Sequence, residues 1–180
     1  MLRFDLPSGA HLRLLEESDA DELFALIDRN RAHLAPWMPW IPATRSREDS
    51  LAFIRMTRRQ IGENDGLQAT IVVDDALAGM VGFHHIDWGN RATTLGYWLA
   101  VDRQRRGTMT EAVRALVDHA FGTWGLHRIE LAAATGNARS RAVAERVGFR
   151  EEGVRRAAER HGDEWLDMVV YAMLATDDPR

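Results

Sequence analysis

The fold of this chain can be inferred from the segment Gln104-Arg105-Arg106-Gly107-Thr108-Met109-Thr110. It lies between an expected strand, residues 93–101, and an expected helix that starts near Met109. A glycine-containing loop that runs from a strand into a helix binds anions, because backbone N–H groups and the positive end of the helix dipole both face it. The segment therefore predicts a phosphate site that needs no lysine.

Upstream of this segment, the spacing of apolar residues indicates two strands, two helices and three further strands. Pro36, Pro39 and Pro42 interrupt residues 31–42, so we expect an aromatic loop there without a regular helix. The last three strands should form an antiparallel meander. The expected elements are strands at 2–6 and 10–15, a helix capped by residues 18–21, a helix from 46 to about 62, and strands at 67–73, 78–86 and 93–101.

Downstream, the pattern alternates between helix and strand. The strand–helix–strand unit between residues 93 and 134 needs a right-handed crossover, so its two strands should pair in parallel. Since no repeat or linker interrupts the sequence, we expect residues 1–180 to form a single domain. The remaining expected elements are a helix from 109 to about 123, a strand at 127–134, a helix at 138–147, and a strand pair at 149–156 and 164–174.

Composition excludes several kinds of chemistry. The chain has no cysteine, which rules out thiolate nucleophiles, disulfides and cysteine-bound zinc. All 23 basic residues are arginine, which rules out a Walker-type phosphate lysine and a Schiff-base lysine. The net charge of -4 argues against a nucleic-acid partner. No apolar run is as long as a membrane span and the N-terminus lacks a signal pattern, so we expect a cytoplasmic protein with no membrane partner.

The order of the expected elements resembles the GNAT superfamily of acyl-CoA N-acyltransferases over nearly the whole chain. That family's pyrophosphate loop, Gln/Arg-x-x-Gly-x-Gly/Ala, corresponds to 104–109 here, although Met109 departs from its last position. Tyr97-Trp98-Leu99 and Met109-Thr110-Glu111-Ala112 resemble instead the branch of ribosomal-protein N-terminal (Rim-type) acetyltransferases. The resemblance implies an α/β (α+β) fold: a mixed, mostly antiparallel central sheet with a splayed parallel strand pair, flanked by helices.

The resemblance also implies acetyl-CoA as co-substrate, with no metal. Backbone N–H groups from Arg106 to Thr110 would surround the CoA pyrophosphate, and the backbone of Leu99 and Val101 would pair with the pantetheine amides. Asn137 and Ser140 resemble the element on the far wall of the CoA channel, although both residue types also cap helices. Solvated surface charge is the alternative interpretation of the arginines. The expected cofactor-binding residues are Leu99, Val101, Gln104, Arg105, Arg106, Gly107, Thr108, Met109, Thr110, Asn137 and Ser140.

Two residues carry the expected catalysis. Many superfamily members have a tyrosine seven residues after the asparagine that protonates the departing thiolate, but Ala144 occupies this position. In the Rim-type branch, a serine stands near the thioester sulfur and a glutamate in the last hairpin takes the proton from the amine. These two residues correspond to Ser140 and Glu159 here. Glu159 can equally be interpreted as an exposed hairpin carboxylate.

The amine acceptor should bind where the first helices, the meander and the last hairpin meet. Trp37 and Trp40 fit its wall, although they also fit a packed loop. Only one of the adjacent His84 and His85 can face a given side of a strand, and neither has metal-ligand spacing. The expected acceptor-binding residues are Trp37, Trp40, His84, His85 and Trp165.

The implied reaction is direct acetyl transfer to a primary amine, most simply a protein N-terminal α-amine of the Ser or Ala type. An α-amine has a pKa of about 8, roughly two units below that of lysine, so a base of ordinary strength can serve it. Acetylation of a small amine (a polyamine or an antibiotic) and a non-catalytic acyl-CoA-binding domain are the alternatives. The resemblance also implies a homodimer, while the apolar run 168–174 fits either core or a dimer contact.

Overall fold

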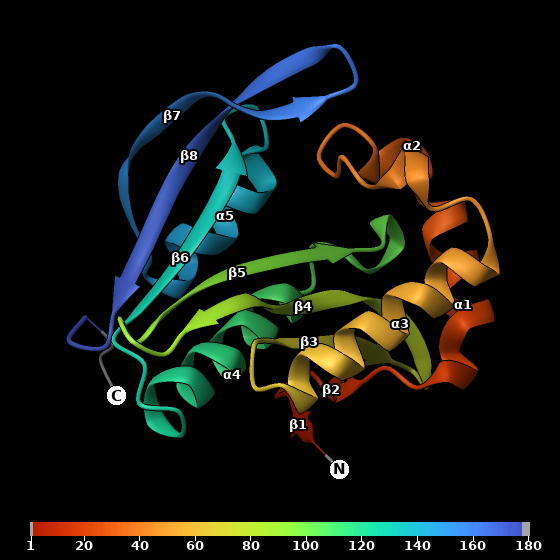
Figure 1. Ribbon diagram of the computed structural model, residues 1–180, viewed down its shortest axis with the longest axis horizontal. Coiled ribbons are helices and arrows are strands. Elements are labelled where there is room, and N and C mark those ends of the chain that lie inside the picture. The colour runs from red at the N-terminus through yellow and green to blue at the C-terminus, as the bar shows by residue number, and fades with distance from the viewer. Residues whose placement is uncertain (1, 178–180) are drawn as a thin grey trace.

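The computed structural model describes residues 2–177, which build one mixed eight-stranded sheet in the order β1-β2-β3-β4-β5-β6-β8-β7 (Figure 1). Within these residues only the β5–β6 pairing is parallel, as the strand–helix–strand unit predicts, and the expected fold class is confirmed. The strands are β1 (Arg3–Asp5), β2 (His11–Leu14), β3 (Leu67–Val73), β4 (Ala76–Asp87), β5 (Ala92–Leu99), β6 (Arg128–Ala134), β7 (Arg150–His161) and β8 (Glu164–Leu174).

Helices cover both faces of the sheet. Helices α1 and α3 lie on one face, and α4 and α5 lie on the other (Figure 1). None of the helices described is long and apolar enough to cross a membrane. The helical elements are η1 (Glu17–Asp19), α1 (Ala20–Arg29), α2 (Arg31–Leu34), η2 (Ile41–Ala43), α3 (Arg47–Gly62), η3 (Val101–Arg103), α4 (Thr108–Gly122) and α5 (Ala138–Val147).

Two hydrophobic cores hold these layers together. On the α4 face, Val113 and Leu116 are fully buried against the sheet, because apolar residues recur every three to four positions along α4. On the α1–α3 face, Leu23, Ile54 and Trp98 belong to the second, smaller core. This second core stops short of β6, β8 and β7, which leaves the sheet open on that side.

Two expected boundaries need correction. Residues 31–42 are not entirely loop, since Arg31–Leu34 form the one-turn helix α2 before Pro36 ends it. The strand expected at 149–156 continues to His161, because Gly162 and Asp163 close a tight hairpin in which His161 is paired with Glu164. Gly162 has a φ of 59°, which suits such a turn.

The parallel pair β5–β6 separates halfway along. Its register runs from Ala92 opposite Arg128 to Leu95 opposite Leu131 and then stops. Beyond this point β5 stays paired with β4, and β6 stays paired with β8. The gap therefore exposes backbone of the second half of β5, and the far end of the β7–β8 hairpin stands across from α2 (Figure 1).

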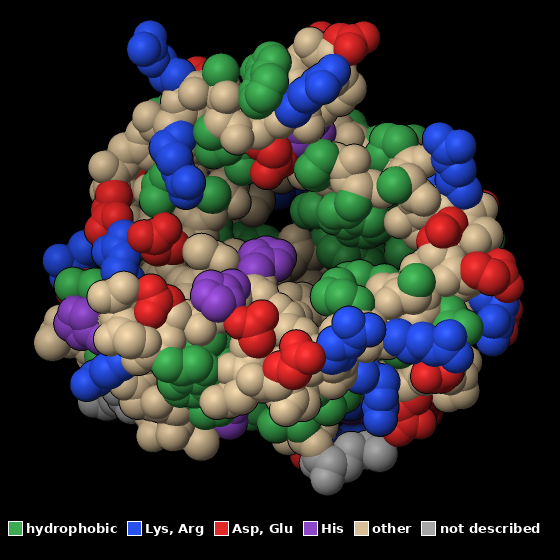
Figure 2. All heavy atoms as spheres, in the orientation of Figure 1, with side chains coloured by type: hydrophobic (Ala, Val, Ile, Leu, Met, Phe, Trp, Pro, Cys, Tyr) green, Lys and Arg blue, Asp and Glu red, His purple; other side chains and the backbone are tan. Residues whose placement is uncertain are grey.

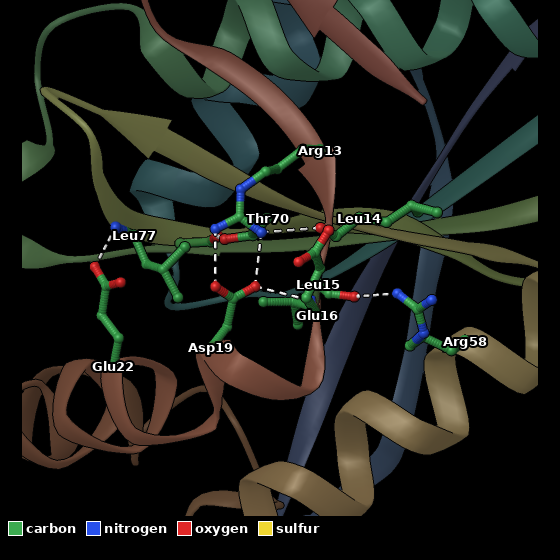
Figure 3. A network of polar contacts seen from close by, with 10 residues as sticks. Arg13, Leu14, Leu15, Glu16, Asp19, Glu22, Arg58, Thr70 and Leu77 are labelled. Atoms are coloured by element: carbon green, nitrogen blue, oxygen red, sulfur yellow. Dashed lines mark hydrogen bonds and ion pairs between the residues drawn. The ribbon is translucent and has the colours of Figure 1, made fainter. Parts of the chain in front are cut away.

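A polar network fixes the start of the chain to the sheet (Figure 3). Arg13 of β2 donates two hydrogen bonds to Asp19, at 2.6 and 2.9 Å, and the Glu16 N–H donates a third at 2.8 Å. Arg58 of α3 donates to the Leu15 carbonyl oxygen at 3.0 Å. These bonds connect β2 to the helices that carry the α1–α3 core.

We expect Asp19→Asn to lower the free energy of unfolding at pH 7 by about 1–2 kcal/mol, because Arg13 loses its carboxylate but stays partly solvated. Burial alone would raise the pKa of Asp19, but the hydrogen bonds from Arg13 and Glu16 outweigh it and hold the pKa below its usual value. The contribution is therefore present above about pH 4 and is lost as the pH falls further. Urea denaturation at pH 7 and pH 3 checks this, since the difference between variant and wild type should shrink at pH 3.

The control is Glu17→Gln, which removes a solvent-exposed ion pair with Arg55. This variant should keep the wild-type denaturation midpoint at both pH values. An equal loss of stability in both variants would contradict a special role for the Arg13–Asp19 pair.

Candidate active site

The loop 104–110 has the geometry of an anion site. Arg105 and Gly107 have φ values of 64° and 83°, and Gly107 is the N-cap of α4. The first-turn N–H groups of a helix have no partner within the helix, so those that follow Gly107 are available to a ligand. A Cβ on Gly107 would meet no protein atom within 4 Å, so the space beside it is open.

Arginine side chains surround this loop. Arg146 donates to Thr110 Oγ1 at 3.0 Å, and Arg139 donates to Gln104 Oε1 at 2.8 Å. Arg105 and Arg106 line the adjoining cavity, whereas Arg103 turns away to pair with Asp74. Positive charge therefore collects around the free N–H groups, as the binding of phosphates requires.

Two cavities open beside the gap between β5 and β6. The first, the loop cavity, has a volume of about 570 Å³ and lies along the segment 104–110, the end of β5 and the start of α5. The second, the hairpin cavity, has a volume of about 730 Å³ and lies between α1, α3, the loop 37–44 and the β7–β8 hairpin. Trp37, Met38, Tyr97, Trp98, Asn137 and Ser140 line both cavities, so the two spaces meet at these residues.

The hairpin cavity is lined by apolar and by charged side chains. Figure 2 shows this face of the molecule hollowed at its centre, with hydrophobic side chains on one wall and histidine and acidic side chains near the rim. Among the charged groups, Asp49, Glu130 and Glu159 outnumber Arg155. The residues of the apolar wall include Trp37, Trp40, Phe53, Met80 and Trp98. Such a cavity suits a ligand with a cationic or amine group.

The junction of the cavities contains a pair of hydroxyl groups. Ser140 Oγ donates to the Tyr97 hydroxyl at 3.1 Å, and the Tyr97 hydroxyl donates to the Ser140 carbonyl oxygen at 2.8 Å. Burial raises the pKa of Tyr97 to about 12, so its hydroxyl stays protonated at neutral pH. Asn137 caps α5, since its Oδ1 accepts the Ser140 N–H at 3.2 Å. Ala144 is fully buried.

A bulge in β7 shapes the strand just before Glu159. The register with β8 shifts between Arg155 and Glu159, Ala157 has a φ of 47°, and the Ala157 N–H donates to Asp167 Oδ1 at 2.8 Å. Bulges of this kind re-aim the side chains that follow them. Glu159 lines the hairpin cavity and contacts His161 Nε2 at 2.6 Å.

Of the expected acceptor residues, Trp37, Trp40 and His84 line the hairpin cavity. Partial desolvation by its surroundings lowers the pKa of His84 below its ordinary value, although the side chain still reaches the surface. His85 and Trp165 lie outside both cavities. The expected alternation of His84 and His85 fails, because β4 bulges here: its register with β5 shifts between Phe83 and Ile86, and both of these residues are buried in the same core. His85 pairs with Asp65, and Trp165 stands beside the hairpin turn with 60% of its surface exposed.

Of the expected cofactor residues, all except Val101 line the loop cavity. Val101 is the second residue after the end of β5, in η3, and its N–H donates to Asn30 Oδ1 at 2.9 Å. Its N–H is therefore already used within the protein. Within residues 2–177 no group of three or more histidine or acidic residues is arranged to hold a metal ion.

The sequence analysis missed several polar groups of the site, among them the Tyr97 hydroxyl, Asp49, Glu130 and Arg155. In the sequence Tyr97 belongs only to the Tyr97-Trp98-Leu99 motif, and its hydrogen bond to Ser140 joins residues 43 positions apart. The one available signal was that position 144 is alanine and not tyrosine. A second hydroxyl near Ser140 must then come from another part of the chain.

Comparisons with known proteins agree with this geometry. A family profile described as an acetyltransferase (GNAT) domain matches residues 10–150. YdaF of Bacillus subtilis (strain 168), named as a candidate ribosomal N-acetyltransferase, is 37% identical over 165 residues, which cover 91% of this chain and 90% of that protein.

Two solved structures are also similar. One is RimL, the ribosomal L7/L12 α-N-protein acetyltransferase, in complex with coenzyme A. It has a TM-score of 0.90 and 27% identity, covering 94% of this chain and 96% of that one. The other is the microcin C7 self-immunity acetyltransferase MccE in complex with acetyl-CoA and AMP. It has a TM-score of 0.88 and 29% identity, covering 92% of both chains.

Proposed function

Since the chain belongs to the GNAT acetyltransferase family, we propose that it transfers the acetyl group of acetyl-CoA to the α-amine of a protein N-terminus of the Ser or Ala type. The observation that carries the proposal is that the loop cavity and the hairpin cavity meet at Ser140. Acetyl-CoA held by the loop at one end and an amine held in the acidic, aromatic cavity at the other would meet at that point.

Acetyl-CoA would bind along the loop cavity. Its pyrophosphate takes the N–H groups after Gly107, with Arg105 and Arg106 beside it. The Ala100 N–H bonds to Ala78 of β4, so by alternation the backbone of Leu99 and Tyr97 faces the gap left by β6. The pantetheine amides would pair with this edge as an added strand does, next to the Gln104 side chain, whose Nε2 donates to the Leu99 carbonyl oxygen at 3.3 Å.

The acetyl transfer requires that the amine is positioned against the thioester and that one base accepts the proton of the amine. The neutral amine attacks the thioester carbonyl carbon, the new C–N bond forms, the C–S bond breaks, and CoA leaves as a thiolate next to Ser140. Glu159 takes the proton that the amine loses, since it lines the cavity that the amine occupies. Asp49 in the same cavity favours the approach of a cationic amine, whereas the charge of Glu130 is largely balanced by its ion pair with Arg128.

Two further observations support an α-amine as acceptor. The α-amine is neutral more often than a lysine side chain at pH 7, so a glutamate can accept its proton at lower cost. RimL, which is similar over nearly its whole length, is a ribosomal L7/L12 α-N-protein acetyltransferase. A ribosomal protein is therefore the acceptor class we favour, and a cytoplasmic site of action follows from that choice.

A small aromatic or nucleotide-bearing amine is the second candidate acceptor. The apolar wall of the hairpin cavity contains Trp37, Trp40, Phe53 and Trp98, which can stack on a planar ring. MccE, which is similar in fold, was solved in complex with acetyl-CoA and AMP. Peptides and free amines in the same assay distinguish the two acceptor classes.

The test is CoA thiol release from acetyl-CoA, measured with short peptides that begin with free Ser, Ala or Thr and with the same peptides blocked at the N-terminus. We expect release with the free peptides only. Release with small amines and none with any free peptide would establish the second candidate. Acetyl-CoA binding without release for any amine would instead indicate a binding domain.

The homodimer and the single domain over residues 1–180 also belong to this proposal. Met168, Val169, Tyr171, Ala172 and Met173 are buried within one chain, so the apolar run in β8 serves the core. A dimer would therefore use another surface. Light scattering at high protein concentration distinguishes monomer from dimer.

A further inference from the structure

The two hydroxyl groups at the junction of the cavities form a closed pair. The Ser140 hydroxyl donates to Tyr97, and the Tyr97 hydroxyl donates to the main-chain carbonyl of Ser140. Tyr97 comes from β5 and Ser140 from the first turn of α5. The pair therefore connects the splayed strand to α5 at the point where the thioester would lie.

Each oxygen of this pair can either donate or accept. The 3.1 Å separation between Ser140 Oγ and the Tyr97 oxygen allows a hydrogen bond in both directions. If Ser140 turns its hydrogen towards a third atom, Tyr97 can turn its own hydrogen from the Ser140 carbonyl to Ser140 Oγ. The Ser140 oxygen then keeps a donor while it donates elsewhere, and such a chain strengthens a bond to an anion.

The pKa values of the Tyr97 hydroxyl and of a thiol decide whether Tyr97 gives its proton to the CoA thiolate or only takes part in hydrogen bonding. A thiol has a pKa of about 8.5, whereas burial raises the pKa of Tyr97 to about 12. Full transfer of the tyrosine proton to a thiolate would therefore be uphill by several pKa units. The hydroxyl pair can stabilise a thiolate by hydrogen bonding and keep both of its protons.

We propose that Tyr97 is a positioning residue for thiolate departure, which acts through Ser140. In the resting protein it holds the Ser140 hydroxyl in place. As the C–S bond breaks, Ser140 Oγ–H turns to the sulfur and Tyr97 O–H turns to Ser140 Oγ, so no proton leaves the pair. The inference rests on the proposed function, which puts the CoA sulfur beside Ser140.

The most direct test titrates the thiol of CoA bound to the intact protein, followed by the ultraviolet absorbance of the thiolate. The titration requires no amine acceptor. A negative result in the titration is therefore distinguishable from a failure of the protein to acetylate peptides. We expect the bound thiol to titrate below its free value, and Tyr97→Phe to raise that titration by roughly one pH unit. Ser140→Ala should raise it at least as far, and the double variant should match Ser140→Ala alone, because Tyr97 acts through Ser140.

Steady-state rates give a second readout. Tyr97→Phe should lower kcat about tenfold, which is the loss of about one hydrogen bond in the transition state, with the KM for acetyl-CoA unchanged. The fold-losses of Tyr97→Phe and Ser140→Ala should not multiply in the double variant. The alkaline limb of the kcat profile should stay unchanged in Tyr97→Phe, since the tyrosine gives up no proton.

The chain offers a matched control in Tyr171, whose hydroxyl also makes two side-chain hydrogen bonds, with Arg141 and Glu145. It lines neither cavity, so Tyr171→Phe should leave the thiol titration at its wild-type value. A wild-type titration for Tyr97→Phe, or losses that multiply in the double variant, would overturn the inference. Circular dichroism confirms that each variant is folded before titration.

Discussion

Gly107→Val should weaken acetyl-CoA binding at least about 100-fold. The φ of 83° at Gly107 is a conformation that β-branched residues avoid at a cost of about 1–2 kcal/mol, so the substitution distorts the loop. The added side chain would also stand in the open space beside the first-turn N–H groups of α4, where the pyrophosphate would lie. Isothermal titration calorimetry with acetyl-CoA measures the change in Kd.

Gly125 supplies the matched control. It also has a left-handed φ, 64°, and a Cβ there would meet no atom within 4 Å, but it lines neither cavity. Gly125→Val should therefore lower the melting temperature and keep the wild-type Kd. If both variants weakened binding equally, the effect would come from lost stability, and the loop would not be the phosphate site.

Glu159→Gln should lower kcat about 100-fold at pH 7 while the Kd for acetyl-CoA stays the same, because a general base contributes at least this much. The residual rate of the variant should rise about tenfold per pH unit up to about pH 8. Without the base, this rate is limited by the fraction of the α-amine that is neutral in solution. Initial rates of CoA release between pH 6 and 9 check both expectations.

Glu164→Gln is the control for this substitution. Glu164 lies in the same hairpin, is exposed, and lines neither cavity. It should keep the wild-type rate and pH profile. Equal rates for both variants and wild type would mean that Glu159 is only an exposed hairpin carboxylate, and that a different group or solvent takes the amine proton.

Local patterns in the sequence were sufficient to predict the layers of this fold. The apolar period of α4 and the alternation in the strands are properties of neighbouring residues, and the right-handed crossover from β5 to β6 follows from general chain geometry. The anion loop was predicted for the same reason, since Gly107 and the helix that follows it are adjacent in sequence. The end of α2 before Pro36 is a local effect too, although the turn itself was missed.

Contacts between distant residues could not be predicted in this way. The Val101 N–H bonds to Asn30, 71 positions away, which removes it from the ligand edge of β5. The bulge before Glu159 depends on Asp167 of the facing strand. Nothing in the residues next to Tyr97 indicates that its hydroxyl faces Ser140. Such pairings are set by where β5 and β6 separate, which is a property of the whole sheet.

The position of the added acetyl group distinguishes an α-amine acceptor from every other amine. A peptide that begins with serine and carries an internal lysine is incubated with the protein and acetyl-CoA, and tandem mass spectrometry locates the added acetyl group. We expect acetylation of the N-terminal nitrogen with the lysine unmodified. Acetylation of the lysine alone, or an unmodified peptide while a small amine in the same mixture is acetylated, would contradict this expectation.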